Sequence, residues 1–159
     1  MGRKISVILF ATLVCCILLS GCGKEPAKEP LVVYSFCGEN ANFSISNGVI
    51  VLSSTEEIFC GGNLDGELSD VVGYSMTFYI PVGNDERILL SNSVEDMTGG
   101  TISISGETGK VSGDILTATE IEELQNNLFF RLKTTNLKGE ENEYQLQLTL
   151  TEITGQLDN

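Results

Sequence analysis

Hydrophobic and polar residues alternate along much of the chain, which is the pattern of β-strands that bury one face. The clearest segment is 144–151, where Tyr or Leu at every second position is interleaved with Gln or Thr. Segments 74–82 and 128–133 alternate in the same way. The β-branched run at 49–52 does not alternate and predicts a central strand covered on both faces. Shorter strands are expected at 31–37, 43–45, 88–90 and 101–105.

Turn signals separate these strands. The Asn-Gly dipeptide at 47–48 predicts a tight hairpin turn because both residues tolerate positive φ, and the glycines at 106–109 predict another turn. A capping box at 119–122 predicts a short helix to about residue 127 that connects the two sheets. About eight short strands with regular turns predict an all-β fold, an antiparallel β-sandwich of immunoglobulin-like topology with this one connecting helix.

The N-terminal segment has a different pattern. Arg3 and Lys4 precede an apolar stretch at 5–19, which ends in Leu19-Ser20-Gly21-Cys22. The stretch is shorter than the roughly 20 residues that cross a bilayer as a helix, so it predicts a cleaved signal helix at 1–21. The tetrapeptide resembles the lipobox of bacterial lipoproteins. This resemblance implies cleavage before Cys22 and covalent diacylglycerol on its sulfur, which would anchor the protein to the extracytoplasmic face of the cell membrane.

The residues after the lipobox divide into a tether and a domain. Segment 22–30 combines charged residues with two prolines and predicts an extended linker. The eight residues that follow Cys22 there reach at most ~26 Å at about 3.3 Å per residue. Segment 31–159 has the length of a single domain, and we expect it to form the β-sandwich.

Charge and composition exclude several classes of function. Loss of Arg3 and Lys4 with the signal would change the net charge from −13 to −15, which repels nucleic acid, so no nucleic-acid partner is expected. The chain has no histidine, which removes the Ser-His and Cys-His dyads and the usual catalytic zinc ligands. We therefore expect no enzyme activity and no cofactor other than the lipid. The acidic pairs at 56–57, 85–86 and 140–141 fall in apparent turns, where solvated charges are expected.

Four oxygen-bearing side chains surround a glycine in one acidic segment. Asn63, Asp65, Glu67 and Asp70 offer the type of ligand that calcium accepts with six to eight oxygens. Their spacing is not that of an EF-hand loop. The sequence therefore leaves two interpretations open, a weak calcium site and a polar turn.

Two cysteines would remain after lipidation of Cys22. Cys37 and Cys60 would lie outside the cytosol, where disulfides persist. A disulfide between Cys37 and Cys60 would contribute roughly 3 kcal/mol to the free energy of unfolding in the chain-entropy model. The alternative is that both are small apolar residues with free thiols.

One further resemblance covers the start of the domain. In segment 34–45, a Gly-Glu-Asn turn precedes a strand that begins with Phe43. This block is similar to the opening of small uncharacterised surface lipoproteins of Gram-positive bacteria. The resemblance implies a membrane-tethered immunoglobulin-like β-sandwich and carries no catalytic residues.

These observations lead to a ranked set of hypotheses. The first is a noncatalytic module that binds or supports another envelope protein, to which the outward aromatics Tyr79 and Phe129 could contribute. The alternative is a small-ligand or cation-binding accessory lipoprotein of a transporter or sensor, suggested by the acidic loops. An envelope hydrolase acting through paired carboxylates is the third and least favoured class.

Overall fold

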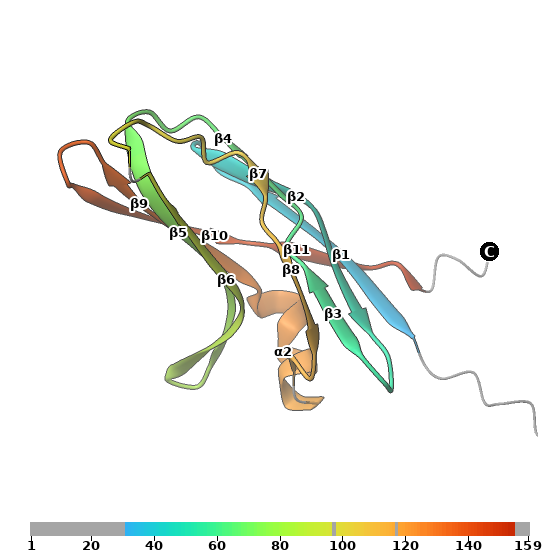
Figure 1. Ribbon diagram of the computed structural model, residues 1–159. Coiled ribbons are helices and arrows are strands. Elements are labelled where there is room, and N and C mark those ends of the chain that lie inside the picture. Colours follow the sequence, from blue (N-terminus) through green and yellow to red (C-terminus); the bar gives the residue numbers. More distant parts are fainter. Residues whose placement is uncertain (1–30, 97, 117, 155–159) are drawn as a thin grey trace, which may run out of the picture.

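The computed structural model describes residues 31–96, 98–116 and 118–154 and shows two antiparallel β-sheets packed face to face (Figure 1). The all-β, antiparallel architecture predicted from the sequence is therefore confirmed. The predicted signal helix at 1–21, the linker at 22–30 and the side chains of the capping box at 119 and 122 lie outside the described residues.

The chain contributes seven strands to one sheet and four to the other, which we call the seven-stranded and the four-stranded sheet. The seven-stranded sheet has the order β11-β1-β2-β3-β8, with β4 pairing β2 and β7. Its strands are β1 (Val32–Glu39), β2 (Phe43–Leu52), β3 (Glu57–Cys60), β4 (Asn63–Gly66), β7 (Gly106–Glu107), β8 (Lys110–Gly113) and β11 (Thr149–Glu152). The four-stranded sheet consists, in order, of β10 (Glu141–Gln147), β9 (Phe129–Asn136), β5 (Val71–Val82) and β6 (Asp85–Glu95).

Four phenylalanine rings hold the two sheets together. Phe36 of β1 and Phe59 of β3 pack against Phe78 of β5, which also contacts Phe130 of β9. The Phe78 ring centroid lies 5.9 Å from that of Phe36, 5.2 Å from that of Phe59 and 4.9 Å from that of Phe130. These inclined arrangements are the ones that aromatic quadrupoles favour. All four side chains are at most 2% exposed, so this phenylalanine cluster is the centre of the core.

The alternating segment at 144–151 is a single stretch that belongs to both sheets. It pairs with β9 as β10, and beyond Leu148 it pairs with β1 as β11. The Leu148 amide donates a hydrogen bond to the Leu128 carbonyl at 2.8 Å, and both side chains are buried. The inward positions thus stay inward while the strand changes partner, which explains why the sequence pattern shows no interruption.

The predicted connecting helix is α2 (Ala118–Asn127), which packs against β5 and β11, one strand from each sheet. Its own Leu124 side chain is fully buried in the core. Glu120 in its first turn forms an ion pair with Arg87 of β6 at 3.8 Å, and Arg87 donates two hydrogen bonds to the Ile115 carbonyl. Within the described ranges, no helix has both the length and the apolar character needed to cross a bilayer.

The hairpin turn predicted at 47–48 is wrong. Strand β2 continues through both residues, and Asn47, with φ of 57°, forms an irregularity at which one edge of β2 changes its partner from β4 to β3. Gly48 lies under the Phe36 ring, where a Cβ would come within 2.1 Å of Phe36 Cε2. The glycine is needed because the neighbouring strand places an aromatic ring against its backbone.

Three further expectations are corrected. Segment 106–109 does not form a hairpin turn, because β7 and β8 run along β4 and β3 with Thr108 buried between them. Its hydroxyl donates to the Gly62 carbonyl at 3.0 Å. Segment 101–105 contains no strand, although Ile104 is buried in the core. The central run at 49–52 does form the middle of a sheet, but only its inward residues Ile50 and Leu52 join the core.

The contact between Gly48 and Phe36 gives a stability prediction. Gly48→Ala should lower the free energy of unfolding by about 2 kcal/mol or more, because the Phe36 ring is held by Phe59 and Phe78 and has no room to shift. Gly73→Ala is the matched control, since its Cβ would make only ordinary contacts of 3.5 Å and longer. Urea unfolding of both variants checks this, and equal stabilities would contradict it.

Candidate functional site

The outer face of the four-stranded sheet carries an ordered set of side chains. Cross-strand register places them in four rows that run from β10 across β9 and β5 to β6. The rows are Glu141-Thr135-Gly73-Glu95, Glu143-Lys133-Ser75-Ser93, Gln145-Arg131-Thr77-Ser91 and Gln147-Phe129-Tyr79-Ile88. Three of the four rows are polar, so this face combines charges and hydroxyl groups on a rigid support.

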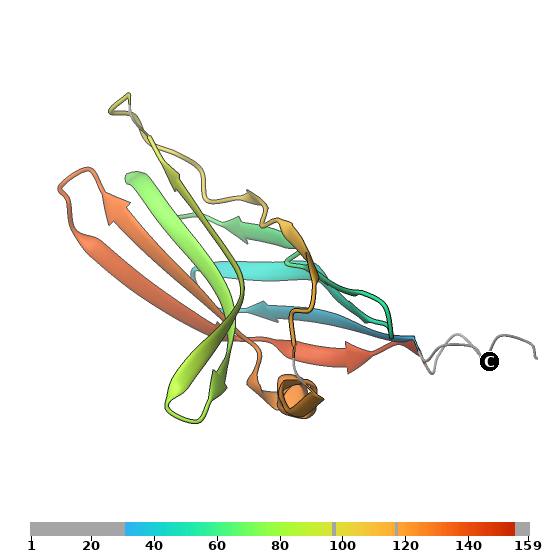
Figure 2. The same ribbon diagram turned by 60° about the horizontal axis from the view of Figure 1, so that its bottom comes forward.

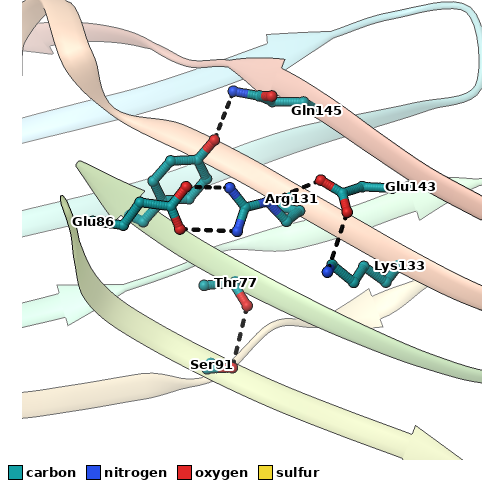
Figure 3. A network of polar contacts seen from close by, with 8 residues as sticks. Thr77, Glu86, Ser91, Arg131, Lys133, Glu143 and Gln145 are labelled. Atoms are coloured by element: carbon teal, nitrogen blue, oxygen red, sulfur yellow. Dashed lines mark hydrogen bonds and ion pairs between the residues drawn. The ribbon is translucent and has the colours of Figure 1, made fainter. Parts of the chain in front are cut away.

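Arg131 organises the centre of this face (Figure 3). Its two terminal nitrogens donate to both carboxylate oxygens of Glu86, one of them at 2.9 Å. Its Nε lies 3.3 Å from Glu143, whose other oxygen is 3.2 Å from the Lys133 ammonium. The guanidinium also stacks on Tyr79, with Cζ 4.4 Å from the ring centroid. Arg131, which lies on β9, is thus in contact with a side chain from each of the other three strands, β5, β6 and β10.

The aromatic residues expected to face outward are largely covered. Tyr79 is only 3% exposed, because Arg131 covers its ring and Phe129 stacks on it at 5.7 Å between centroids. Its hydroxyl accepts a hydrogen bond from the Gln145 amide at 2.6 Å. Tyr79 therefore supports the face from below and offers no free ring to a partner.

The ion pairs affect protonation of the face. The hydrogen bond from Arg131 lowers the pKa of Glu86 below its ordinary value, against an opposing effect of desolvation. The same hydrogen bond raises the pKa of Arg131 still further above the physiological range. Both groups are charged at neutral pH, and the bidentate geometry fixes the guanidinium plane.

A groove of about 530 Å³ lies at one end of this face. All four strands contribute to its lining, and the lining includes the complete first two rows. Gly73 has no side chain, and Ser75 and Ser93 have small ones where longer side chains surround them, so these three residues form its floor. We call this feature the row-end groove.

The row-end groove lies far from the start of β1, the first strand of the domain. Glu143 in the groove is nine residues before Glu152, and Glu152 pairs with Tyr34 near the start of β1. At about 3.3 Å per residue, this separation along β10 and β11 amounts to roughly 30 Å. Both views show the β9–β10 hairpin and the end of β11 on opposite sides of the molecule (Figures 1 and 2).

The four residues considered for calcium are not gathered around one point. Asn63 and Asp65 are exposed on β4, while Glu67 and Asp70 lie in the segment that leads to β5. Asp65 accepts a hydrogen bond from the Ser105 hydroxyl at 3.1 Å. Among the residues that the structure describes, no group of three or more acidic, cysteine or histidine side chains could hold a metal. The calcium site and the polar segment both stay predictions.

Cys37 and Cys60 are free thiols, so the disulfide considered from the sequence is not formed. They lie on β1 and β3, and β2 runs between these strands. Two interstrand spacings separate them by about 10 Å, whereas the Cα atoms of a disulfide are usually 4.4 to 6.8 Å apart. The sheet order therefore opposes the bridge, which sequence separation alone could not reveal.

Sequence reasoning did not identify the row-end groove. Its residues belong to four strands, and only the register brings Glu95 and Glu141 into one row. The available signal was local, namely that the outward positions of β5 begin with the small residues Gly73 and Ser75.

Comparisons with protein-family models, curated proteins and solved structures find no match for this chain.

The Glu86–Arg131 pair predicts a pH dependence. The folded state lowers the pKa of Glu86, so the charged Glu86 stabilises the fold. This stabilisation is fully present above the pKa of about 4.3 that Glu86 has in the unfolded chain, and it is lost as the pH falls through the pKa of Glu86 in the folded protein. Glu86→Gln should therefore lower the free energy of unfolding by about 0.5–1 kcal/mol at pH 7 and hardly change it near pH 2. Urea unfolding at both pH values checks this, and a cost that does not depend on pH would refute it.

The cysteine geometry predicts the thiol chemistry. Without reductant, iodoacetamide should modify both Cys37 and Cys60, and Cys37 should react faster because it is exposed whereas Cys60 is half-buried. Peptide mass mapping of the non-reduced protein measures this. Recovery of a peptide that links Cys37 to Cys60 would show that the strands rearrange. Cys37→Ser serves as the control for assigning the fast site.

Proposed function

We propose that this protein is a lipid-anchored, extracytoplasmic and noncatalytic module that binds another envelope component through the outer face of its four-stranded sheet. The observation that carries the proposal is the row-end groove, a concave surface of about 530 Å³ on a rigid polar face. Grooves of this volume fall in the range of about 300–1,000 Å³ that is usual for binding sites.

The position of the groove supports this role. Lipid on Cys22 and the linker at 22–30 would hold the domain at the end where β1 begins. The groove lies roughly 30 Å along β10 and β11 from that end. A partner would then approach from outside the membrane surface, instead of from within the bilayer.

The chemistry of the face supports binding over catalysis. The whole chain lacks histidine, and the charged groups at the centre of the face are engaged with one another, as Arg131 is with Glu86 and Glu143. Such pairs fix the shape of a surface. The groove has hydroxyl groups and carboxylates available for recognition at its floor and edges.

The immunoglobulin-like subtype remains a prediction. In immunoglobulin domains one sheet has the order A-B-E-D, in which consecutive strands do not all pair. Here β1, β2 and β3 pair consecutively in one sheet. The proposal uses only the two-sheet architecture and the rigid face that it provides.

Site-specific photo-cross-linking in intact cells tests the function. A photoreactive residue at Ser93, in the groove floor, should yield an adduct with another envelope component, because a bound partner would cover it. The control position is Ser112, which is exposed on β8 of the seven-stranded sheet. Absence of any adduct from Ser93, or equal adducts from both positions, would overturn the proposal.

A further inference from the structure

We propose that the row-end groove binds an extended, cationic peptide segment that crosses the strands and places two basic side chains, four residues apart, over Glu95 and Glu141. This inference rests on the proposed function and specifies the partner chemistry for the same groove. It is carried by the charge distribution, the spacing and the floor of the groove.

The charge distribution identifies the sign of the ligand. The lining contains Glu95, Glu141 and Glu143 against a single cation, Lys133, which leaves an excess of negative charge. Glu143 is already engaged by Lys133 and by Arg131. Within the described residues, Glu95 and Glu141 have no ion-pair partner, so their carboxylates are the ones available to a cationic ligand.

The spacing identifies the form of the ligand. Glu95 on β6 and Glu141 on β10 stand at the two ends of the first row, with β5 and β9 between them. Three interstrand spacings of about 4.8 Å separate these positions by about 14 Å. Among the residues that the structure describes, no group of three or more acidic side chains could hold a metal ion there. Residues i and i+4 of an extended peptide lie on one face about 13 Å apart, which matches.

The floor of the groove provides space for the residue between the two basic side chains. Residue i+2 of such a peptide faces the same way and would lie near the middle of the row, where Gly73 has no side chain. Ser75, Ser93 and Thr135 add hydroxyl groups that can donate to or accept from the peptide backbone. A Cβ at Gly73 would meet only ordinary contacts, so a side chain can start there without a clash at its first carbon, and we expect a longer one to fill the groove.

Two synthetic peptides of identical composition test the spacing. Acetylated and amidated Lys-Thr-Ser-Thr-Lys has its lysines four residues apart, whereas Lys-Lys-Thr-Ser-Thr has them adjacent. Calorimetric titration of the full protein at low salt should show the first peptide binding about fivefold more tightly, because only it can reach both carboxylates. The advantage should shrink as salt is added.

Two sets of variants locate the effect. Glu95→Gln with Glu141→Gln should remove the preference, and Gly73→Leu should weaken binding of both peptides by filling the floor. The matched control is Glu39→Gln with Glu107→Gln, which changes the net charge equally at exposed positions of the seven-stranded sheet. The control variant should retain the wild-type preference.

The outcomes separate this inference from the proposed function. Equal affinities for the two peptides, or a preference that survives in the Glu95 and Glu141 variant, would overturn the cationic-peptide inference. If Ser93 still yields a cross-linked partner in cells, the groove remains a binding surface for other chemistry. Failure of the cross-linking at Ser93 would instead remove the proposed function.

Discussion

Packing between the two sheets depends on the contact of Phe78 with the rings around it. Phe78 touches Phe36 and Phe59 of the opposite sheet and Phe130 of its own, and it is completely buried. Side chains in such a centre have no free volume, so the surrounding backbone must adapt to them. The glycine at position 48 is one such adaptation, because the Phe36 ring occupies the place of its side chain.

This inward packing leaves the outer face of the four-stranded sheet free to carry polar groups. Each inward residue of β5 and β9 alternates with an outward one, so the rows that contain Arg131, Lys133 and Glu143 follow directly from the core pattern. The bidentate contact between Arg131 and Glu86 then fixes side chains that would otherwise be mobile. The inward residues of these strands form the core, and the outward residues of the same strands form the polar surface.

The sequence predicted the features that depend on one strand at a time. The alternation at 128–133 and 144–151 marked the inward residues correctly, since period-two alternation records a single buried face. Features that depend on neighbouring strands were not predictable. The role of Gly48 depends on a ring from β1, and the separation of Cys37 from Cys60 depends on the intervening β2. The groove required the register of four strands, which no local pattern contains.

The strand that passes from β10 to β11 has a consequence for how the domain unfolds. Because one uninterrupted stretch pairs with β9 in one sheet and with β1 in the other, neither sheet can lose this strand without exposing the core face of both. Leu146 and Leu148, on either side of the change of partner, are buried between the sheets. The two sheets therefore form one cooperative unit, in which local opening at the groove is opposed by the hydrogen bonds at the distant end.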